Sequence, residues 1–188
     1  SELDYNLLMT ESVNEAVKEF DIPLVKQGVW TPNGTKPGLD YMVSLCKEYL
    51  KQIKDGDLPN VVGIEEKFEF FHKNIKMVGY IDRIDKVDEN TYKVIDYKTS
   101  KNFKYLKPLQ LLVYAKAIKQ KYSDAKNILG SFIMIKHNFE EKSIAIDDDA
   151  IDGAIKKIES VAEMINTDKV WQKKPSVLCN WCDYKDEC

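Results

Sequence analysis

Asp96 and Lys98 form the first group of residues in this sequence whose types and spacing could do chemistry. They lie in a segment, residues 93–99, whose β-branched and aromatic residues predict a β-strand. Successive side chains of a strand alternate between its two faces, so residues two positions apart point to the same side. The sequence therefore predicts a carboxylate and an ammonium group side by side on one face of a sheet.

Asp82 is the third member of this group, and the preceding predicted strand carries it. A three-residue turn that ends at Asn90, with Asn90 in the left-handed conformation, would pair Val87 with Thr91. In that register Asp82 falls opposite Asp96, whereas a two-residue turn would put the two carboxylates on opposite faces. We therefore expect the three-residue turn.

Two facing carboxylates repel each other in a partly buried place, and a divalent cation is the usual means of keeping both ionised. Oxygen ligands favour Mg²⁺ or Mn²⁺ over Zn²⁺. Phosphodiester hydrolysis needs such a cation together with a group, here Lys98, that orients the attacking water. For an Asp-x-Lys pattern alone, however, an ordinary salt bridge on an exposed strand is the commoner explanation.

A longer series of motifs favours the catalytic interpretation. Gly-x-x-Asp-Arg-Ile-Asp at residues 79–85 is followed by Ile-Asp-Tyr-Lys-Thr at residues 95–99 and by Gln-Leu-Leu-Val-Tyr at residues 110–114. This series resembles that of the RecB-like nucleases of the PD-(D/E)XK superfamily, which include the AddB nuclease domain and the CRISPR spacer-acquisition exonucleases. With the C-terminal cysteines, the resemblance covers about half of the chain.

The resemblance implies roles for individual residues. Asp82 and Asp96 would be the metal-binding carboxylates, Lys98 the catalytic lysine, and Gln110 and Tyr114 the helix motif near the DNA. Residues four positions apart share one face of a helix, which independently places the last two side by side. The alternative for that pair is a solvated helix face.

Glu65 resembles the glutamate that the family carries one strand earlier, in Glu-x-x-Phe, and would then join the metal site. Its alternative is an exposed strand glutamate beside Lys67. Many relatives also carry a histidine on a helix before the strands, but this chain has only His72 and His137, and neither lies there. Either another residue replaces that ligand, or the matching helix lies upstream of this sequence.

Three of the four cysteines, Cys179, Cys182 and Cys188, lie within the last ten residues. Thiolates this close together indicate a metal site, and their spacing alone leaves Zn²⁺ and an iron–sulfur cluster open. The resemblance favours a [4Fe–4S] cluster, because relatives have a C-terminal triplet of this form and a fourth cysteine far upstream. Cys46 is the remaining candidate ligand, although its position on an apolar helix stripe also suits a buried core thiol.

Lys101, Lys104 and Lys107 follow Lys98 at intervals of three residues and suggest a track for DNA phosphates, to which Arg83 would add. The alternative is a solvated loop. The chain has a formal net charge of −3 and so no overall field that attracts nucleic acid. Any binding of DNA would depend on a local patch of this kind.

The elements that must position these residues predict one compact α/β domain of mixed α+β type. Its restriction-endonuclease-like core would be a central mixed sheet of about five strands flanked by helices. We expect an N-terminal helical region at 1–60, a nuclease core at 61–170 and a cysteine-rich, cluster-binding tail at 171–188. The expected elements are helices at 6–20 and 39–53, strands at 61–71, 75–87 and 91–98, a helix from Pro108 to about Tyr122 with an apolar stripe of Leu109, Leu112, Val113 and Ile118, strands at 128–136 and 142–146, and a helix that begins at Asp147–Asp149.

The sequence therefore predicts a Mg²⁺- or Mn²⁺-dependent deoxyribonuclease. We expect an exonuclease that acts on single-stranded DNA or DNA ends in recombination, repair, phage replication or CRISPR adaptation. The alternatives are a non-catalytic iron–sulfur module that binds DNA or braces a helicase partner, and a zinc-stabilised interaction domain. Because no stretch is long and apolar enough to span a bilayer and no secretory pattern opens the chain, we expect a cytoplasmic protein of a prokaryote or a phage.

Overall fold

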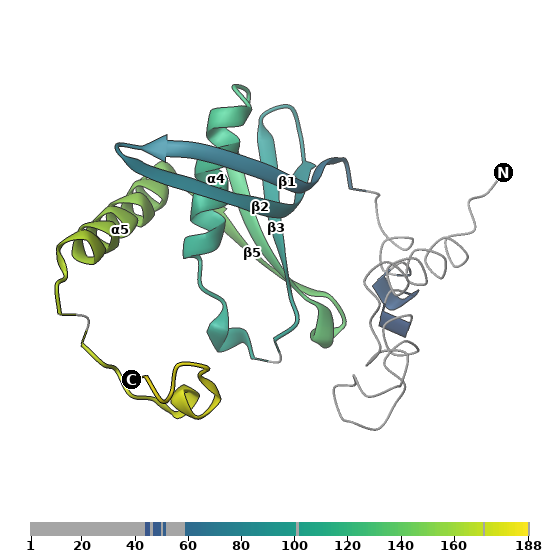
Figure 1. Cartoon of the computed structure of the whole chain (residues 1–188). Helices are drawn as coiled ribbons and strands as arrows, with labels where there is room; N and C mark the ends of the chain where they lie inside the picture. Colours follow the sequence, from purple (N-terminus) through teal and green to yellow (C-terminus); the bar gives the residue numbers. More distant parts are fainter. Residues whose placement is uncertain are drawn as a thin grey trace.

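The computed structural model describes residues 44–45, 47–49, 51, 59–100, 102–170 and 172–187. Five strands form a single sheet, and helices α4 and α5 follow β3 and β5 in the chain (Figure 1). The elements are β1 (Val61–His72), β2 (Ile75–Lys86), β3 (Thr91–Lys98), α4 (Leu109–Lys121), β4 (Asn127–Met134), β5 (Glu140–Ile146) and α5 (Asp148–Thr167), with short 3-10 helices at Phe103–Tyr105, Ile135–His137 and Val177–Trp181. No helix within the described ranges is long and apolar enough to cross a membrane.

The sheet has the order β1-β2-β3-β4-β5 and is mixed, as predicted. β1, β2 and β3 form an antiparallel meander, β3 and β4 run parallel, and β4 pairs with β5 in the antiparallel sense. The parallel pair requires a crossover connection, which α4 provides. This connection brings the N-terminal end of α4 back beside the end of β3, where Lys98 lies.

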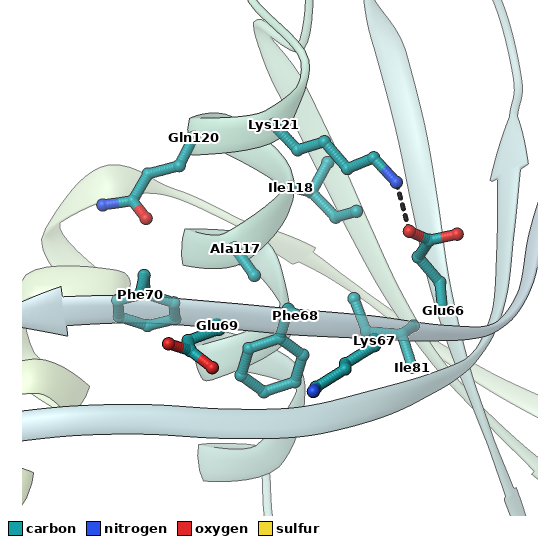
Figure 2. Close-up of a pocket in the computed structure, with 10 residues that line it drawn as sticks. All are labelled: Glu66, Lys67, Phe68, Glu69, Phe70, Ile81, Ala117, Ile118, Gln120 and Lys121. Carbon is teal, nitrogen blue, oxygen red and sulfur yellow. Dashed lines mark hydrogen bonds and ion pairs between the residues drawn. The ribbon is translucent and has the colours of Figure 1, made fainter.

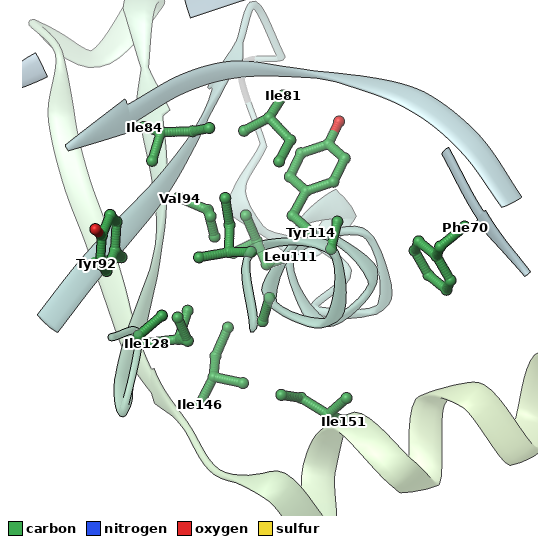
Figure 3. Close-up of a cluster of buried hydrophobic side chains, with 14 of the residues drawn as sticks. Phe70, Ile81, Ile84, Tyr92, Val94, Leu111, Tyr114, Ile128, Ile146 and Ile151 are labelled. Carbon is green, nitrogen blue, oxygen red and sulfur yellow. The ribbon is translucent and has the colours of Figure 1, made fainter. Parts of the chain in front are cut away.

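The hydrophobic core lies between the sheet and the two helices (Figure 3). α4 contacts β1, β3, β4 and α5, so most of its surface is covered. Its buried residues are Leu111, Tyr114, Ala115, Ala117 and Ile118. The predicted apolar stripe of the helix was therefore wrong in part. Leu109, Leu112 and Val113 are only partly buried, because a helix packed between a sheet and a second helix carries two apolar stripes and the spacing alone does not rank them.

Three details of the predicted elements need correction. Asn90 does not adopt the left-handed conformation. Its backbone N–H instead donates to Asp88 Oδ1 at 2.8 Å, and this local bond holds the turn. Pro108 is the N-cap of α4 rather than its first helical residue. The fourth strand ends at Met134, where the chain enters a 3-10 helix, and β5 is longer than predicted.

The N-terminal predictions fall mostly on residues outside the described ranges. The helix expected at 6–20 lies entirely outside them. Of the helix expected at 39–53, residues 44–45, 47–49 and 51 are described, and all of these are helical.

Candidate active site

Asp82 and Asp96 face each other at the point where β2 and β3 separate. The ladder pairs Lys86 with Tyr92 and Arg83 with Ile95, and the same register places Asp82 opposite Asp96. The predicted register is therefore correct, although Asn90 reaches it by another turn conformation. Beyond Arg83 the backbone pairing stops, and the backbone N–H of Tyr97 donates to Asp82 Oδ2 at 2.8 Å. The Asp82 carboxylate is thus fixed by the neighbouring strand.

Asp96 is buried, with 2% of its surface exposed. Its Oδ2 atom lies 2.6 Å from Lys98 Nζ in an ion pair and has no other polar partner among the described residues. Burial raises the pKa of Asp96, the ion pair with Lys98 offsets part of that rise, and the charge of Asp82 adds to it. The interpretation as an ordinary exposed salt bridge is therefore wrong, because the carboxylate of the pair is buried and lies near a second negative charge.

Lys98 connects this carboxylate to helix α4. Lys98 Nζ donates to Gln110 Oε1 at 2.9 Å, and Gln110 Nε2 donates to the Tyr114 hydroxyl at 2.7 Å. The ammonium also lies 5.7 Å from the centroid of the Phe132 ring. The predicted side-by-side placement of Gln110 and Tyr114 is confirmed, and the alternative of a solvated helix face is wrong, since Tyr114 is buried.

The Tyr114 hydroxyl lies in the electrostatic field of the acidic residues. Burial raises the pKa of Tyr114, and the hydrogen bond from Gln110 lowers it in part. The negative charges of Asp96, Asp82 and Glu65 raise it further. The hydroxyl therefore stays protonated and can donate a hydrogen bond of its own.

Phe68 and Gly79 support the site, and sequence reasoning assigned neither a role. They pair across the β1–β2 ladder, and a Cβ atom on Gly79 would lie 2.8 Å from Phe68 Cζ. The Phe68 ring also meets the Tyr114 ring edge to face, with centroids 5.7 Å apart. The glycine of the Gly-x-x-Asp motif thus makes room for the ring that packs against Tyr114. In the sequence, the glycine of the Gly-x-x-Asp motif is the feature that could have predicted this contact with Phe68.

Glu65 is exposed on β1 and adopts a φ of 47°. It lies between the paired residues Ile64 and Glu66, which are opposite Arg83 and Ile81, so it stands at the level of Asp82. Its negative charge contributes to the raised pKa of the Tyr114 hydroxyl. The left-handed backbone at a non-glycine residue is uncommon and locally strained, and in a strand it redirects the side chain.

The donor set fits a hard divalent cation. Asp82 and Asp96 offer carboxylate oxygens, and the polar partner of the buried Asp96 Oδ2 is the Lys98 ammonium. Within the described part of the chain, no group of three or more His, Cys, Asp or Glu side chains is gathered closely enough to hold a metal. Mg²⁺ does not require one, because it is commonly bound by one or two carboxylates together with water and substrate phosphate oxygens.

Arg83 is not brought to this site. It lies on the opposite face of the sheet, where Nε and Nη2 donate to the two carboxylate oxygens of Asp85 at 2.7 and 2.6 Å. Nη1 donates to the hydroxyls of Tyr49 and Tyr97 at 2.5 and 3.2 Å. Burial lowers the pKa of Arg83, but the hydrogen bonds with Asp85 and Tyr97 outweigh it and raise the pKa overall. The guanidinium is therefore fully engaged within the protein.

Of the predicted lysine track, Lys104 and Lys107 are described, and both are exposed; Lys101 lies outside the described residues. Lys107 lies at a cavity of about 500 Å³ that opens beside Lys98. Its walls come from β3, α4 and α5 and from the segment before α4: Lys98, Lys107, Leu109, Gln110, Val113, Tyr114 and Ile158. Three of these residues also build the hydrogen-bonded chain described above.

A second cavity, of about 290 Å³, lies between β1 and the C-terminal half of α4 (Figure 2). Glu66 and Lys121 form an ion pair across its edge, so the charges there satisfy each other. None of its lining residues belongs to the Asp96 site. We therefore place the chemistry at the first cavity.

Of the predicted cluster ligands, only Cys179 and Cys182 are described; Cys46 and Cys188 lie outside the described residues. Both described cysteines are free thiols. A 3-10 helix places them one turn apart, with the Cys182 backbone N–H donating to the Cys179 carbonyl at 3.3 Å. Cys179 Sγ accepts the backbone N–H of Ser176 at 3.3 Å, a contact of the kind that tunes thiolate ligands.

Known proteins resemble this chain in sequence and in fold. Residues 5–188 match the family model described as "PD-(D/E)XK nuclease superfamily". No curated protein matches the sequence. Among solved structures, a candidate exonuclease from Eubacterium rectale aligns with a TM-score of 0.51 at 12% identity, over 97% of this chain and 81% of that protein. The structure of SSO0001 aligns with a TM-score of 0.42 at 18% identity, over 100% of this chain and 87% of that one. The first likeness supports the fold of this chain and nothing about its activity. The second, with the lower TM-score, supports no conclusion.

Proposed function

Because this chain belongs to the PD-(D/E)XK nuclease superfamily, we propose that it is a divalent-metal-dependent deoxyribonuclease whose site is built by Asp82, Asp96 and Lys98. The observation that carries the proposal is the buried Asp96 carboxylate, which lies near a second carboxylate, Asp82, with Lys98 as its single cationic partner. Burial and the charge of Asp82 both disfavour the ionised form of Asp96, and a divalent cation between the two carboxylates would favour it.

Asp82 and Asp96 would hold the cation, Mg²⁺ or Mn²⁺. Glu65 stands at the same level of the sheet but is not gathered with them, so it would join the site once its exposed side chain turned toward the cation. When bound, such a cation acidifies a water molecule and neutralises the charge that develops on the phosphate. Both carboxylates are held in place before it binds, Asp82 by the Tyr97 amide and Asp96 by burial. Little reorganisation is then needed when substrate arrives.

Lys98 is the residue that would touch the reacting atoms. An ammonium group carries three donors, and the contacts with Asp96 and Gln110 account for no more than two. The remaining donor can orient the attacking water or neutralise a phosphate oxygen. Gln110 positions Lys98 through its carbonyl oxygen, and Tyr114 fixes which way the Gln110 amide points. Lys101, Lys104 and Lys107 would contact DNA phosphates along the segment that leads to the site.

A direct cleavage assay tests this proposal. Purified protein is incubated with end-labelled single-stranded DNA in Mg²⁺, in Mn²⁺ and in chelator. We expect cleavage with either metal, none in chelator, and a loss of activity in Asp96→Asn and Asp82→Asn. Glu89→Gln is the matched control, because it removes an exposed carboxylate from the turn at the other end of β3. Equal cleavage by wild type and Asp96→Asn would remove the proposal.

We further propose that the enzyme works from strand ends, as an exonuclease of the RecB-like branch. The pathways we infer are recombination, repair, phage replication or CRISPR adaptation in a prokaryotic cytoplasm, with a helicase or another pathway protein as partner. Circular single-stranded DNA of the same sequence provides the test. An exonuclease leaves it intact while degrading the linear form, and cutting of both at equal rates would contradict end dependence.

The cysteine tail is proposed to bind a [4Fe–4S] cluster, with Zn²⁺ as the alternative. The described pair fits either, since the two thiols lie one turn apart and Cys179 Sγ already accepts a backbone N–H. Cys188 and Cys46 would complete the ligand set. Anaerobic purification followed by metal analysis separates the two: iron with visible absorbance supports the cluster, and zinc in a colourless protein overturns it.

A further inference from the structure

The cavity beside Lys98 has the composition of a nucleotide site. Leu109 and Val113 lie four residues apart on one face of α4, and Ile158 closes the cavity from α5. The charged residues that line it are Lys98 and Lys107, and its lining includes no carboxylate. Its ligand should therefore combine a flat apolar body with negative charge, which describes a nucleobase and its phosphate.

The position of the cavity links it to the acidic pair. Lys98, Gln110 and Tyr114 line the cavity and also form the hydrogen-bonded chain that ends at Asp96. A phosphate bound at Lys98 would therefore lie within one nucleotide of a base inside the cavity. The volume of about 500 Å³ falls within the usual range for small-molecule sites and leaves room for a base and its sugar.

We propose that this cavity binds the unpaired base of a nucleotide adjacent to the phosphate that is cut, an inference that rests on the proposed function. A base inside a duplex is stacked and paired and cannot enter a space walled by two helices, so the nucleotide must be single-stranded or frayed from an end. The cavity thereby selects strands with unpaired bases. Because its apolar walls accept any base face, the selection is for an unpaired base rather than for a sequence.

Equilibrium binding in chelator, where no strand is cut, tests the cavity without relying on cleavage. The probes are fluorescent single-stranded oligonucleotides that carry one abasic residue, moved by one position from probe to probe. We expect one abasic position to weaken binding about tenfold, the value of one stacked base. Equal affinity for every probe would overturn the proposal.

Val113→Trp fills the cavity and should bind the intact strand as weakly as wild type binds the most affected abasic probe. Val87→Trp is the matched control, because Val87 is exposed beside the turn at the far end of β3. Leu109→Ala is a second variant that keeps the proposal testable if the tryptophan prevents folding, since Leu109 is partly exposed at the start of α4. It should weaken binding of the intact strand and leave the abasic probe unaffected. Wild-type affinity in both cavity variants would contradict the assignment.

The two proposals can fail separately. Binding that depends on one base, without any metal-dependent cleavage, would sink the nuclease function and keep the cavity. Cleavage that is equal for intact and abasic strands, and equal in wild type and Val113→Trp, would sink the cavity and keep the nuclease.

Discussion

Two neighbouring strands carry the same short pattern, an acid and a base two residues apart, and the structure uses them in opposite ways. Arg83 and Asp85 on β2 form a bidentate pair whose hydrogen bonds are all made. Asp96 and Lys98 on β3 form an ion pair through one carboxylate oxygen, Oδ2, with no second contact from the ammonium. The two acid side chains are almost equally exposed, at 5% and 4%, so burial does not explain the difference.

The surroundings of the two pairs explain it. Arg83 is enclosed by Asp85 and two tyrosine hydroxyls, whereas Lys98 keeps 29% of its side chain exposed and turns toward Gln110. Asp96 also faces a second carboxylate, Asp82, while Asp85 pairs across the ladder with Lys93. A carboxylate that binds a guanidinium through both oxygens stabilises one conformation, whereas one that lies beside a second carboxylate is suited to binding a cation.

The largest expected effect is on cleavage by Asp96→Asn. Removal of one charge of the pair should weaken cation binding and lower the cleavage rate on the order of a thousandfold. The same variant should melt at a higher temperature than wild type in chelator, because the amide removes a buried charge. Thermal unfolding measured alongside activity checks both. A variant that is inactive and also less stable would contradict the comparison.

Asp85→Asn should lower stability and leave cleavage unchanged, which is the opposite of the result expected for Asp96→Asn. It breaks a buried ion pair and leaves the Arg83 charge without its partner, which should cost about 3–5 kcal/mol of unfolding free energy. Cleavage per folded molecule should stay near the wild-type value, because Arg83 and Asp85 lie on the other face of the sheet. Denaturant unfolding measures the first quantity and initial rates the second. Loss of activity without loss of stability would assign this pair to the site.

Gly79→Ala tests how the hairpin supports Tyr114. A Cβ at this position meets the Phe68 ring at 2.8 Å, so this ring, which also packs against Tyr114, must shift. Overpacking of this kind costs about 1–3 kcal/mol. Gly153→Ala is the control, because a Cβ there has open space. Equal unfolding free energies for the two variants would remove Phe68 and Gly79 from the account.

The smallest effect is a difference in pH dependence between metal-free wild type and Asp96→Asn. The folded-state pKa of Asp96 is raised, so its contribution to stability is full below the ordinary aspartate value of about 3.9 and is lost as the pH rises through the raised value. The stability advantage of Asp96→Asn should therefore grow as the pH rises from about 4 toward neutrality. Melting curves in chelator across that range check the sign, and an advantage that shrinks would contradict the direction of the shift.

Much of the site could be predicted from sequence because strand alternation and the register of one hairpin determine it. Those two rules place Asp82, Asp96 and Lys98 on one face, and the structure agrees. The same alternation already excludes Arg83, because a residue next to Asp82 in a strand must point the other way. A DNA contact by Arg83 would therefore have to form on that opposite face, where the guanidinium already binds Asp85.

Other features depend on three-dimensional packing that the sequence pattern does not contain. Tyr114 is buried because α4 lies between the sheet and α5. Either apolar stripe of this helix could face either partner, so the sequence alone does not say which of its residues are buried. The cavity at Lys98 needs Ile158, which is 60 residues further along the chain than Lys98.

The most direct measurement is Mn²⁺ binding, followed by the loss of the electron paramagnetic resonance signal of free Mn²⁺ during titration with protein. The account predicts that wild type and Asp85→Asn bind the ion with similar affinity, and that Asp96→Asn loses binding at the same concentrations. Equal binding by Asp96→Asn and wild type would show that the buried Asp96 carboxylate is not a cation ligand, and the proposed nuclease site would have to be abandoned.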